Sequence, residues 1–239
     1  MSTPAPSIPT LSVEADVFVF DVCDTLFYSN TTFDFLRFVL EQQGSRGKQA
    51  VLKALTFRWS PLFVGLVVWQ KAMGGDPVKA AALRLLAGTP QEELYELGRR
   101  FVAEFLPSRR IAQTHELLTS LGRARTRVLL LSASLDPIIT ALAAELGKME
   151  FVSSQLEYDV QGRCTGRLQR ELTGQKQDAL RQLLGAPAET VRLAVATDNF
   201  TDRELVTQAA VRYVVVHNAA AKHFWQELNP HFIEAYLQA

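Results

Sequence analysis

Four short segments of this sequence carry acidic, hydroxyl or lysine side chains of the kind that handle phosphate. They are Asp21-Val-Cys-Asp-Thr-Leu26, Ser132-Ala-Ser134, Gly174-Gln-Lys176 and Thr197-Asp-Asn-Phe-Thr-Asp202. A carboxylate such as Asp21 can attack phosphorus and form an aspartyl-phosphate. Mg²⁺ prefers a few carboxylates with water and phosphate oxygens, and Asp21, Asp198 and Asp202 can supply them. Ser132 and Lys176 can hydrogen-bond and neutralise a phosphoryl group during its transfer.

Each segment taken alone also has a purely structural interpretation. Ser132 can cap the following helix, and Thr201 with Glu204 fits a capping box. Lys176 fits this interpretation less well, because a cation in the first turn of a helix opposes the helix dipole. The sequence contains no GxGxxG motif, no Walker loop and no Cys/His zinc spacing, each of which would indicate a different kind of binding site. The four segments together therefore favour a phosphate site.

The elements that must position these segments are strands that alternate with helices. Strands are predicted at 16–20, 127–132, 150–154, 191–197 and 212–216, with a β-hairpin at 156–160 and 164–168. Helical patterns fill residues 30–106, between the first two strands. Alternation of this kind predicts a parallel sheet between helical layers, with ligands bound at the carboxyl ends of the strands. The sequence therefore predicts an α/β domain with a helical insertion after its first strand.

Composition narrows the class of protein. At about 150 residues per domain, the 239 residues predict one to two domains. The 25 basic and 25 acidic residues balance, which argues against a nucleic-acid partner. Two cysteines cannot form a disulfide framework, so a reducing, cytoplasmic location is expected. Residues 1–12 are rich in Pro, Ser and Thr and are expected to form a flexible tail.

The four segments, in this order, resemble the motifs of the haloacid dehalogenase (HAD) superfamily, and most closely its phosphoserine-phosphatase-like branch. The resemblance implies a Rossmannoid three-layer core with a predominantly parallel sheet, formed by 13–29 and 107–239, and an α-helical cap domain at 30–106. It further implies that Asp21 is the nucleophile and that Thr25, Ser132 and Lys176 bind phosphate. Mg²⁺ would be held by Asp21, Asp198, Asp202 and the backbone carbonyl of Cys23. The expected substrate is a small or lipid-like phosphorylated metabolite.

One position departs from the family pattern. HAD phosphatases carry a second Asp two residues after the nucleophile, where this sequence has Cys23 followed by Asp24. That Asp acts as general acid and base, a role worth about 10²–10⁴ in rate. Three alternatives follow: Asp24 takes over the role, the substrates have good leaving groups, or turnover is lost. In the last case the chain binds phosphate or metal, or docks to membranes.

Substrate choice in this superfamily rests on the cap, where the apolar segment Trp59–Gln70 lies within a basic stretch. Its 12 residues are too short to span a bilayer. Two interpretations stand. The segment is the buried core helix of the cap, or it forms a hydrophobic wall for a lipid-like or aromatic phosphate or a peripheral membrane contact.

Overall fold

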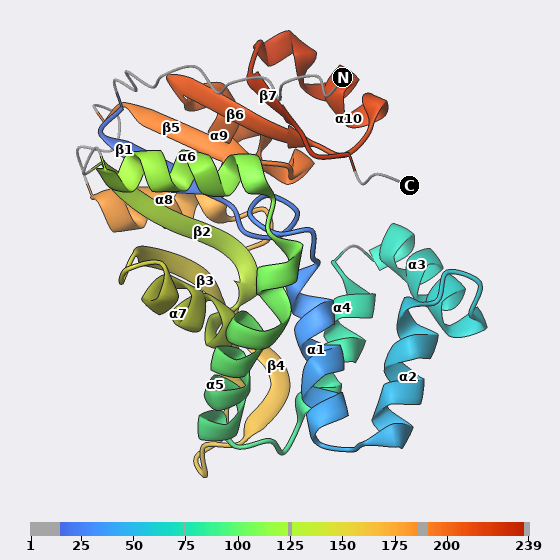
Figure 1. The fold of residues 1–239 in the computed structure, drawn as a ribbon. Coiled ribbons are helices and arrows are strands. Elements are labelled where there is room, and N and C mark those ends of the chain that lie inside the picture. The colour runs from blue at the N-terminus through green and yellow to red at the C-terminus, as the bar shows by residue number, and fades with distance from the viewer. Residues whose placement is uncertain (1–14, 74, 124–125, 186–190, 237–239) are drawn as a thin grey trace, which may run out of the picture.

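The computed structural model of the chain describes residues 15–73, 75–123, 126–185 and 191–236, and the predicted tail at 1–12 lies outside them. A seven-stranded sheet with the order β4-β3-β2-β1-β5-β6-β7 forms its centre (Figure 1). Neighbouring strands are parallel, except that β3 and β4 are antiparallel. The predicted α/β class with a predominantly parallel sheet is confirmed. The strands are β1 (Val17–Phe20), β2 (Arg127–Leu135), β3 (Glu150–Tyr158), β4 (Cys164–Arg170), β5 (Leu193–Thr197), β6 (Val211–Val216) and β7 (His231–Glu234).

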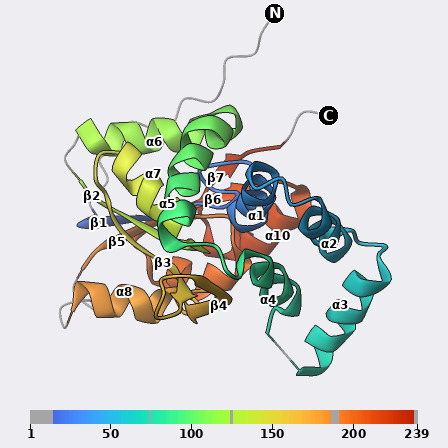
Figure 2. The same ribbon diagram turned by 90° about the horizontal axis from the view of Figure 1, so that it is seen from below.

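Helices cover both faces of this sheet, and one group of them is inserted between β1 and β2 (Figures 1 and 2). The inserted helices are α1 (Thr31–Gln42), α2 (Arg46–Thr56), α3 (Pro61–Met73), α4 (Pro77–Leu83) and α5 (Gln91–Arg100), with short 3₁₀ or π turns at Arg84–Leu86, Phe101–Phe105 and Leu106–Arg109. The later helices are α6 (Ala112–Arg123), α7 (Asp136–Glu145), α8 (Lys176–Leu184), α9 (Arg203–Gln208) and α10 (Ala219–Trp225), with 3₁₀ turns at Phe200–Asp202 and Gln226–Leu228. The extent of a separate cap domain stays a prediction.

The alternation of side chains along β1 explains the layers. Because successive residues of a strand point to opposite faces, Phe18 and Phe20 enter one hydrophobic cluster, and Val17 and Val19 enter another. The second cluster joins the sheet to α8, α9 and α10. The first joins it to α6, α7 and the inserted helices, for example through Phe35. The insertion and the sheet therefore share one core.

Two glycines let the insertion approach the rest of the chain closely. A Cβ added at Gly98 of α5 would lie 2.4 Å from the backbone oxygen of Pro137 in α7. At Gly166 of β4, which has φ +78°, it would lie 2.7 Å from the Cα of Arg84. Larger residues at these positions would separate the packed elements.

Three sequence-based assignments need correction. The predicted strand at 150–154 and the first hairpin strand are one continuous strand, β3, which turns at 159–163 into β4. β7 was not predicted, because its four residues directly follow Pro230 and show little alternation. The sequence Asp136-Pro137 predicts an N-cap at Asp136, but Asp136 is the first residue of α7 and its side chain accepts hydrogen bonds from Tyr95 Oη (2.7 Å) and Leu156 N (3.0 Å).

The apolar segment at 59–70 is not a buried core helix. It forms α3 and the residues before it, at the outer edge of the molecule in Figure 2. The side chain of Trp59 is 85% exposed, and those of Val68 and Trp69 are 62% and 59% exposed. Among the described residues no single helix meets the length and hydropathy of a membrane span, whereas Arg46–Thr56 and Pro61–Trp69 meet them together, with a 57° bend.

Candidate active site

Asp21 lies directly after the central strand β1, at the carboxyl edge of the sheet. Its backbone N–H donates to the carbonyl of Ala196 in β5 (2.9 Å), which extends the pairing of β1 with β5 by one residue. Its carboxylate is held from two sides. Oδ1 accepts a hydrogen bond from Val22 N (2.7 Å), and Oδ2 lies 2.8 Å from Lys176 Nζ. Asp21 is only 4% exposed, so the sheet edge fixes its side chain in place.

Lys176 is the first residue of α8 and points toward the same edge. Its ammonium group also lies 2.7 Å from Asp202 Oδ2. Burial alone would lower the pKa of Lys176, but the carboxylates of Asp21 and Asp202 outweigh burial and raise it. The lysine is therefore charged, and these two anions explain a cation in the first turn of a helix. Lys176 thus places a buried positive charge between two carboxylates at the sheet edge.

Asp198 and Asp202 follow β5 and are held by neighbouring hydroxyl groups. Thr25 Oγ1 donates to Asp198 Oδ1 (3.0 Å) and accepts from Asp198 N (2.9 Å), and Thr197 Oγ1 donates to Asp202 Oδ2 (2.6 Å). Burial raises the pKa of Asp198, and the charges of Asp21 and Asp24 raise it further. The negative charge of the carboxylates at this edge is therefore greater than the single positive charge of Lys176.

Cys23 lies in a network of hydroxyl groups. Its Sγ is 2.9 Å from Thr31 Oγ1 and 3.1 Å from Ser134 Oγ. Ser132 Oγ in turn donates to Ser134 Oγ (3.1 Å). Burial raises the pKa of the Cys23 thiol, and the negative charge of Asp21 adds to the effect. The group stays a neutral thiol near neutral pH, which makes it a poor proton donor compared with a carboxylic acid.

Asp24 adopts φ +46°, in the left-handed region that Asp tolerates better than most residues. Its backbone carbonyl is 2.7 Å from His217 Nε2, whose other ring nitrogen is 3.0 Å from the carbonyl of Ala235. Burial raises the pKa of the Asp24 carboxyl, and Asp21 adds to this while His217 opposes it. A raised pKa brings a carboxyl group closer to the range suited to a general acid.

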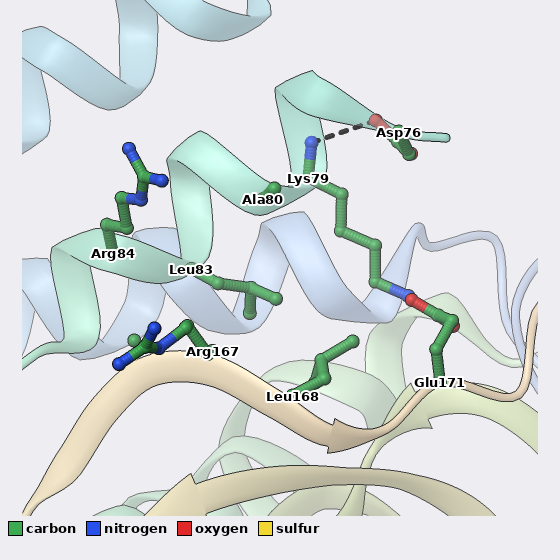
Figure 3. Close-up of a pocket in the computed structure, with 9 residues that line it drawn as sticks. Asp76, Lys79, Ala80, Leu83, Arg84, Arg167, Leu168 and Glu171 are labelled. Carbon is green, nitrogen blue, oxygen red and sulfur yellow. Dashed lines mark hydrogen bonds and ion pairs between the residues drawn. The ribbon is translucent and has the colours of Figure 1, made fainter. Parts of the chain in front are cut away.

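A pocket of about 360 Å³ opens beside these residues, lined by Cys23, Asp24 and Asp198 from the sheet edge and by Asp76 and Lys79 from α4 and its N-cap. A second pocket of about 340 Å³ between α4 and β4 shares Asp76 and Lys79 (Figure 3). Lys79 reaches across from α4, with its Nζ 3.0 Å from Glu171 Oε2. The inserted helices therefore supply one wall of the pocket beside Asp24.

The structure brings the predicted site residues to one edge of the sheet but divides them into two groups. Asp21, Lys176 and Asp202 form a buried cluster, and Thr25 holds Asp198 beside it. The hydroxyl of Ser132 is joined to Ser134 and not to this cluster. Sequence reasoning missed the residues that hold the site from outside its motifs, which are Thr31, Lys79 and His217. It included Thr197 in the fourth segment but assigned it no role, whereas its hydroxyl group holds Asp202. His217 alone had a usable signal, since it follows β6 directly.

The oxygen donors fit Mg²⁺, which takes one or two protein carboxylates and keeps several waters. Asp21 and Asp198 offer carboxylates, and Cys23 offers a backbone carbonyl. Asp202 is bound to Lys176 and Thr197 in this structure. Within the described ranges, no three His, Cys, Asp or Glu side chains are grouped as ligands of one metal ion.

The fold and the site define an α/β protein with a carboxylate-rich centre, which holds the buried Lys176, at the carboxyl edge of a predominantly parallel sheet. The model of the haloacid dehalogenase-like hydrolases matches residues 18–206. The chain belongs to that family, and the predicted membership is confirmed. No curated protein matches the sequence.

Solved structures share the fold at low sequence identity. A protein of unknown function from Bordetella pertussis has a TM-score of 0.74 at 17% identity, with 91% of this chain and 97% of that one covered. A cytosolic 5'-nucleotidase IIIB bound to cytidine has a TM-score of 0.62 at 15% identity, with 93% of this chain and 81% of that one covered. A probable phosphoserine phosphatase from Vibrio cholerae gives 0.59 at 16% identity, with 87% and 58% covered. The likeness to this phosphoserine phosphatase concerns the fold and covers most of the present chain but little more than half of the other.

Proposed function

We propose that this chain is a Mg²⁺-dependent phosphohydrolase that acts through an aspartyl-phosphate at Asp21 on a small or lipid-like phosphate monoester. The observation that carries the proposal is the 2.8 Å contact of Asp21 with Lys176, both of which are buried. A carboxylate beside a buried cation can attack a phosphoryl group whose charge that cation neutralises. Family membership supports the same reaction, as do the names of two similar structures, a probable phosphoserine phosphatase and a 5'-nucleotidase.

The reaction consists of two displacements at phosphorus. In the first, a carboxylate oxygen of Asp21 forms a bond to phosphorus, and the bond to the leaving oxygen breaks. In the second, water attacks phosphorus, releases inorganic phosphate and regenerates Asp21. Lys176 stays charged through both steps, so it can neutralise the transferred group. Mg²⁺ held by Asp21, Asp198 and the Cys23 carbonyl would supply further positive charge to the phosphate oxygens.

The leaving oxygen also needs a proton, and Asp24 is our candidate donor. Asp24 lines the pocket, and its pKa is raised. Cys23 occupies the position of the family's acid but carries a thiol whose own pKa is raised. The reaction is therefore expected to be slow with poor leaving groups and faster with aryl or acyl phosphates.

Steady-state hydrolysis of an aryl phosphate and an alkyl phosphate, each with and without Mg²⁺, tests the proposal. We expect Mg²⁺-dependent turnover of the aryl ester, and its loss in the isosteric variant Asp21→Asn. Turnover that Asp21→Asn retains would refute an aspartyl-phosphate. If Asp24 is the acid, Asp24→Asn slows the alkyl ester much more than the aryl ester.

A second candidate function is that of a phosphate- or metal-binding protein without turnover, and the thiol at Cys23 is the observation that favours it. A binding protein would be stabilised against heat by Mg²⁺ or by a phosphate analogue. It would turn over neither ester.

A further inference from the structure

The exposed face of α3 plays no part in the proposed reaction. Residues 61–69 of this helix, PLFVGLVVW, are all apolar. Phe63, Leu66 and Val67 form its half-buried side. The large apolar side chains on its open side are Leu62, Val64, Val68 and Trp69, between 46% and 62% exposed. A helix that is apolar all round is normally buried in a protein core or in a membrane, and one face of α3 has no such cover within the described chain.

Aromatic residues lie near both ends of this helix, and basic residues precede it in the sequence and lie near its end. Trp59 precedes the helix and Trp69 lies near its end, and both are exposed. Tryptophan is enriched where a membrane meets water. Residues 43–75 contain five basic residues, Arg46, Lys48, Lys53, Arg58 and Lys71, and no acidic one. Basic residues next to an apolar face are attracted to anionic lipid headgroups.

The length of α3 suits a helix that lies on a bilayer. Its 13 residues give about 20 Å at 1.5 Å per residue, less than the hydrocarbon thickness of about 30 Å. α2 cannot extend it, because Leu52 and Leu55 are buried in the protein core and the two helices are bent by 57°. The apolar face can therefore enter a membrane surface only while the helix stays in its plane.

We propose that α3 and the preceding residues 57–60 dock onto the surface of a bilayer that contains anionic lipid. A lipid surface is favoured over a second copy of the chain, because a symmetric dimer through this face would bring the basic residues of both copies together. The proposal is independent of the proposed reaction, since neither Asp21 nor Lys176 belongs to this surface.

Co-sedimentation with phosphatidylcholine vesicles, with and without phosphatidylglycerol, tests the docking. We expect binding to the anionic vesicles, reduced at least about tenfold by the double variant Val64→Ser/Val68→Ser, which removes apolar contact area. The matched control is Val160→Ser, since Val160 is 96% exposed but lies in the turn between β3 and β4. The variant Lys53→Gln/Arg58→Gln is expected to weaken binding and its dependence on salt.

Tryptophan fluorescence reports the orientation. The chain has three tryptophans, of which Trp225 is fully buried. Vesicle binding should therefore shift the emission of Trp59 and Trp69 to the blue, and Trp59→Phe/Trp69→Phe should remove the shift but keep the binding. Asp21→Asn should bind vesicles as the unaltered chain does, which separates docking from catalysis.

Three outcomes would overturn the docking proposal. The first is no sedimentation with anionic vesicles. The second is equal binding by the Val64→Ser/Val68→Ser variant, with an unchanged melting temperature. The third is a concentration-dependent dimer that this variant abolishes, which would assign the face to a second copy of the chain.

Discussion

Replacing Cys23 with aspartate puts a carboxyl group where the family carries its acid, and we expect faster hydrolysis of an alkyl phosphate. The thiol lies 2.9 Å from Thr31 Oγ1 and 3.1 Å from Ser134 Oγ, so two hydroxyl groups are placed to bind the new carboxylate. General acid help is worth about 10²–10⁴ in rate, or about 2.7–5.5 kcal/mol of the barrier. Because the new charge lies near Asp21, we expect a gain near the lower end, about 10².

The gain must depend on the leaving group. An aryl phosphate needs little protonation, so its kcat/KM should rise less than about tenfold. Cys23→Asn is the matched control, because it has the shape of aspartate without its proton. Equal gains on both esters, or equal effects of Asn and Asp, would refute the reasoning. No gain in Cys23→Asp, together with loss of alkyl hydrolysis in Asp24→Asn, would show that Asp24 already supplies the full rate effect of a general acid, so that the thiol at Cys23 does not slow the reaction.

Three further predictions concern stability in urea. Lys176→Met leaves two buried carboxylates without their cation, so it should cost about 3–5 kcal/mol, and a loss under about 1 kcal/mol would contradict this. Gly98→Ala places a methyl group against the backbone of Pro137 and should cost about 1–3 kcal/mol. The control is Gly65→Ala, whose new methyl group has no atom within 4 Å and which should stabilise the helix by about 0.5–1 kcal/mol. Burial opposes ionisation of Glu171, yet the Thr173 backbone and Lys79 outweigh burial and lower the pKa of this carboxyl group. The loss of unfolding free energy in Glu171→Gln should therefore be constant near neutral pH. It should shrink below about pH 4, where the carboxylate of the unaltered chain becomes protonated.

The sheet and its carboxyl edge were predictable because short-range patterns determine them. The apolar runs of β1 and β2 mark strands, and parallel strands bring their ends to one edge. Asp21, Lys176 and Asp202 could therefore be placed together from the sequence alone, and the structure brings them into contact. The order of the four segments along the chain indicated which side chains lie at this edge.

The contacts made by the insertion could not be predicted in this way. A helical period shows that Lys79 lies on a helix, but not that this helix lies against Glu171. Thr31 reaches Cys23 only because α1 begins at the sheet edge. For α3 the difficulty is greater, since a helix that is apolar on all sides contains no periodicity to tell its inner face from its outer face. Tertiary packing decides these contacts.

The hydrophobic cluster that joins the inserted helices to the sheet has a consequence for how the molecule melts. Phe35 of α1 and Phe101 after α5 belong to the same cluster as Phe18 of β1 and Ile138 of α7. Separating the insertion from the sheet would expose both sides of this cluster to water. Heating should therefore unfold the described chain in one cooperative transition, in which the calorimetric and van't Hoff enthalpies agree. A version shortened by deleting the helices between β1 and β2 would lose one side of its own core.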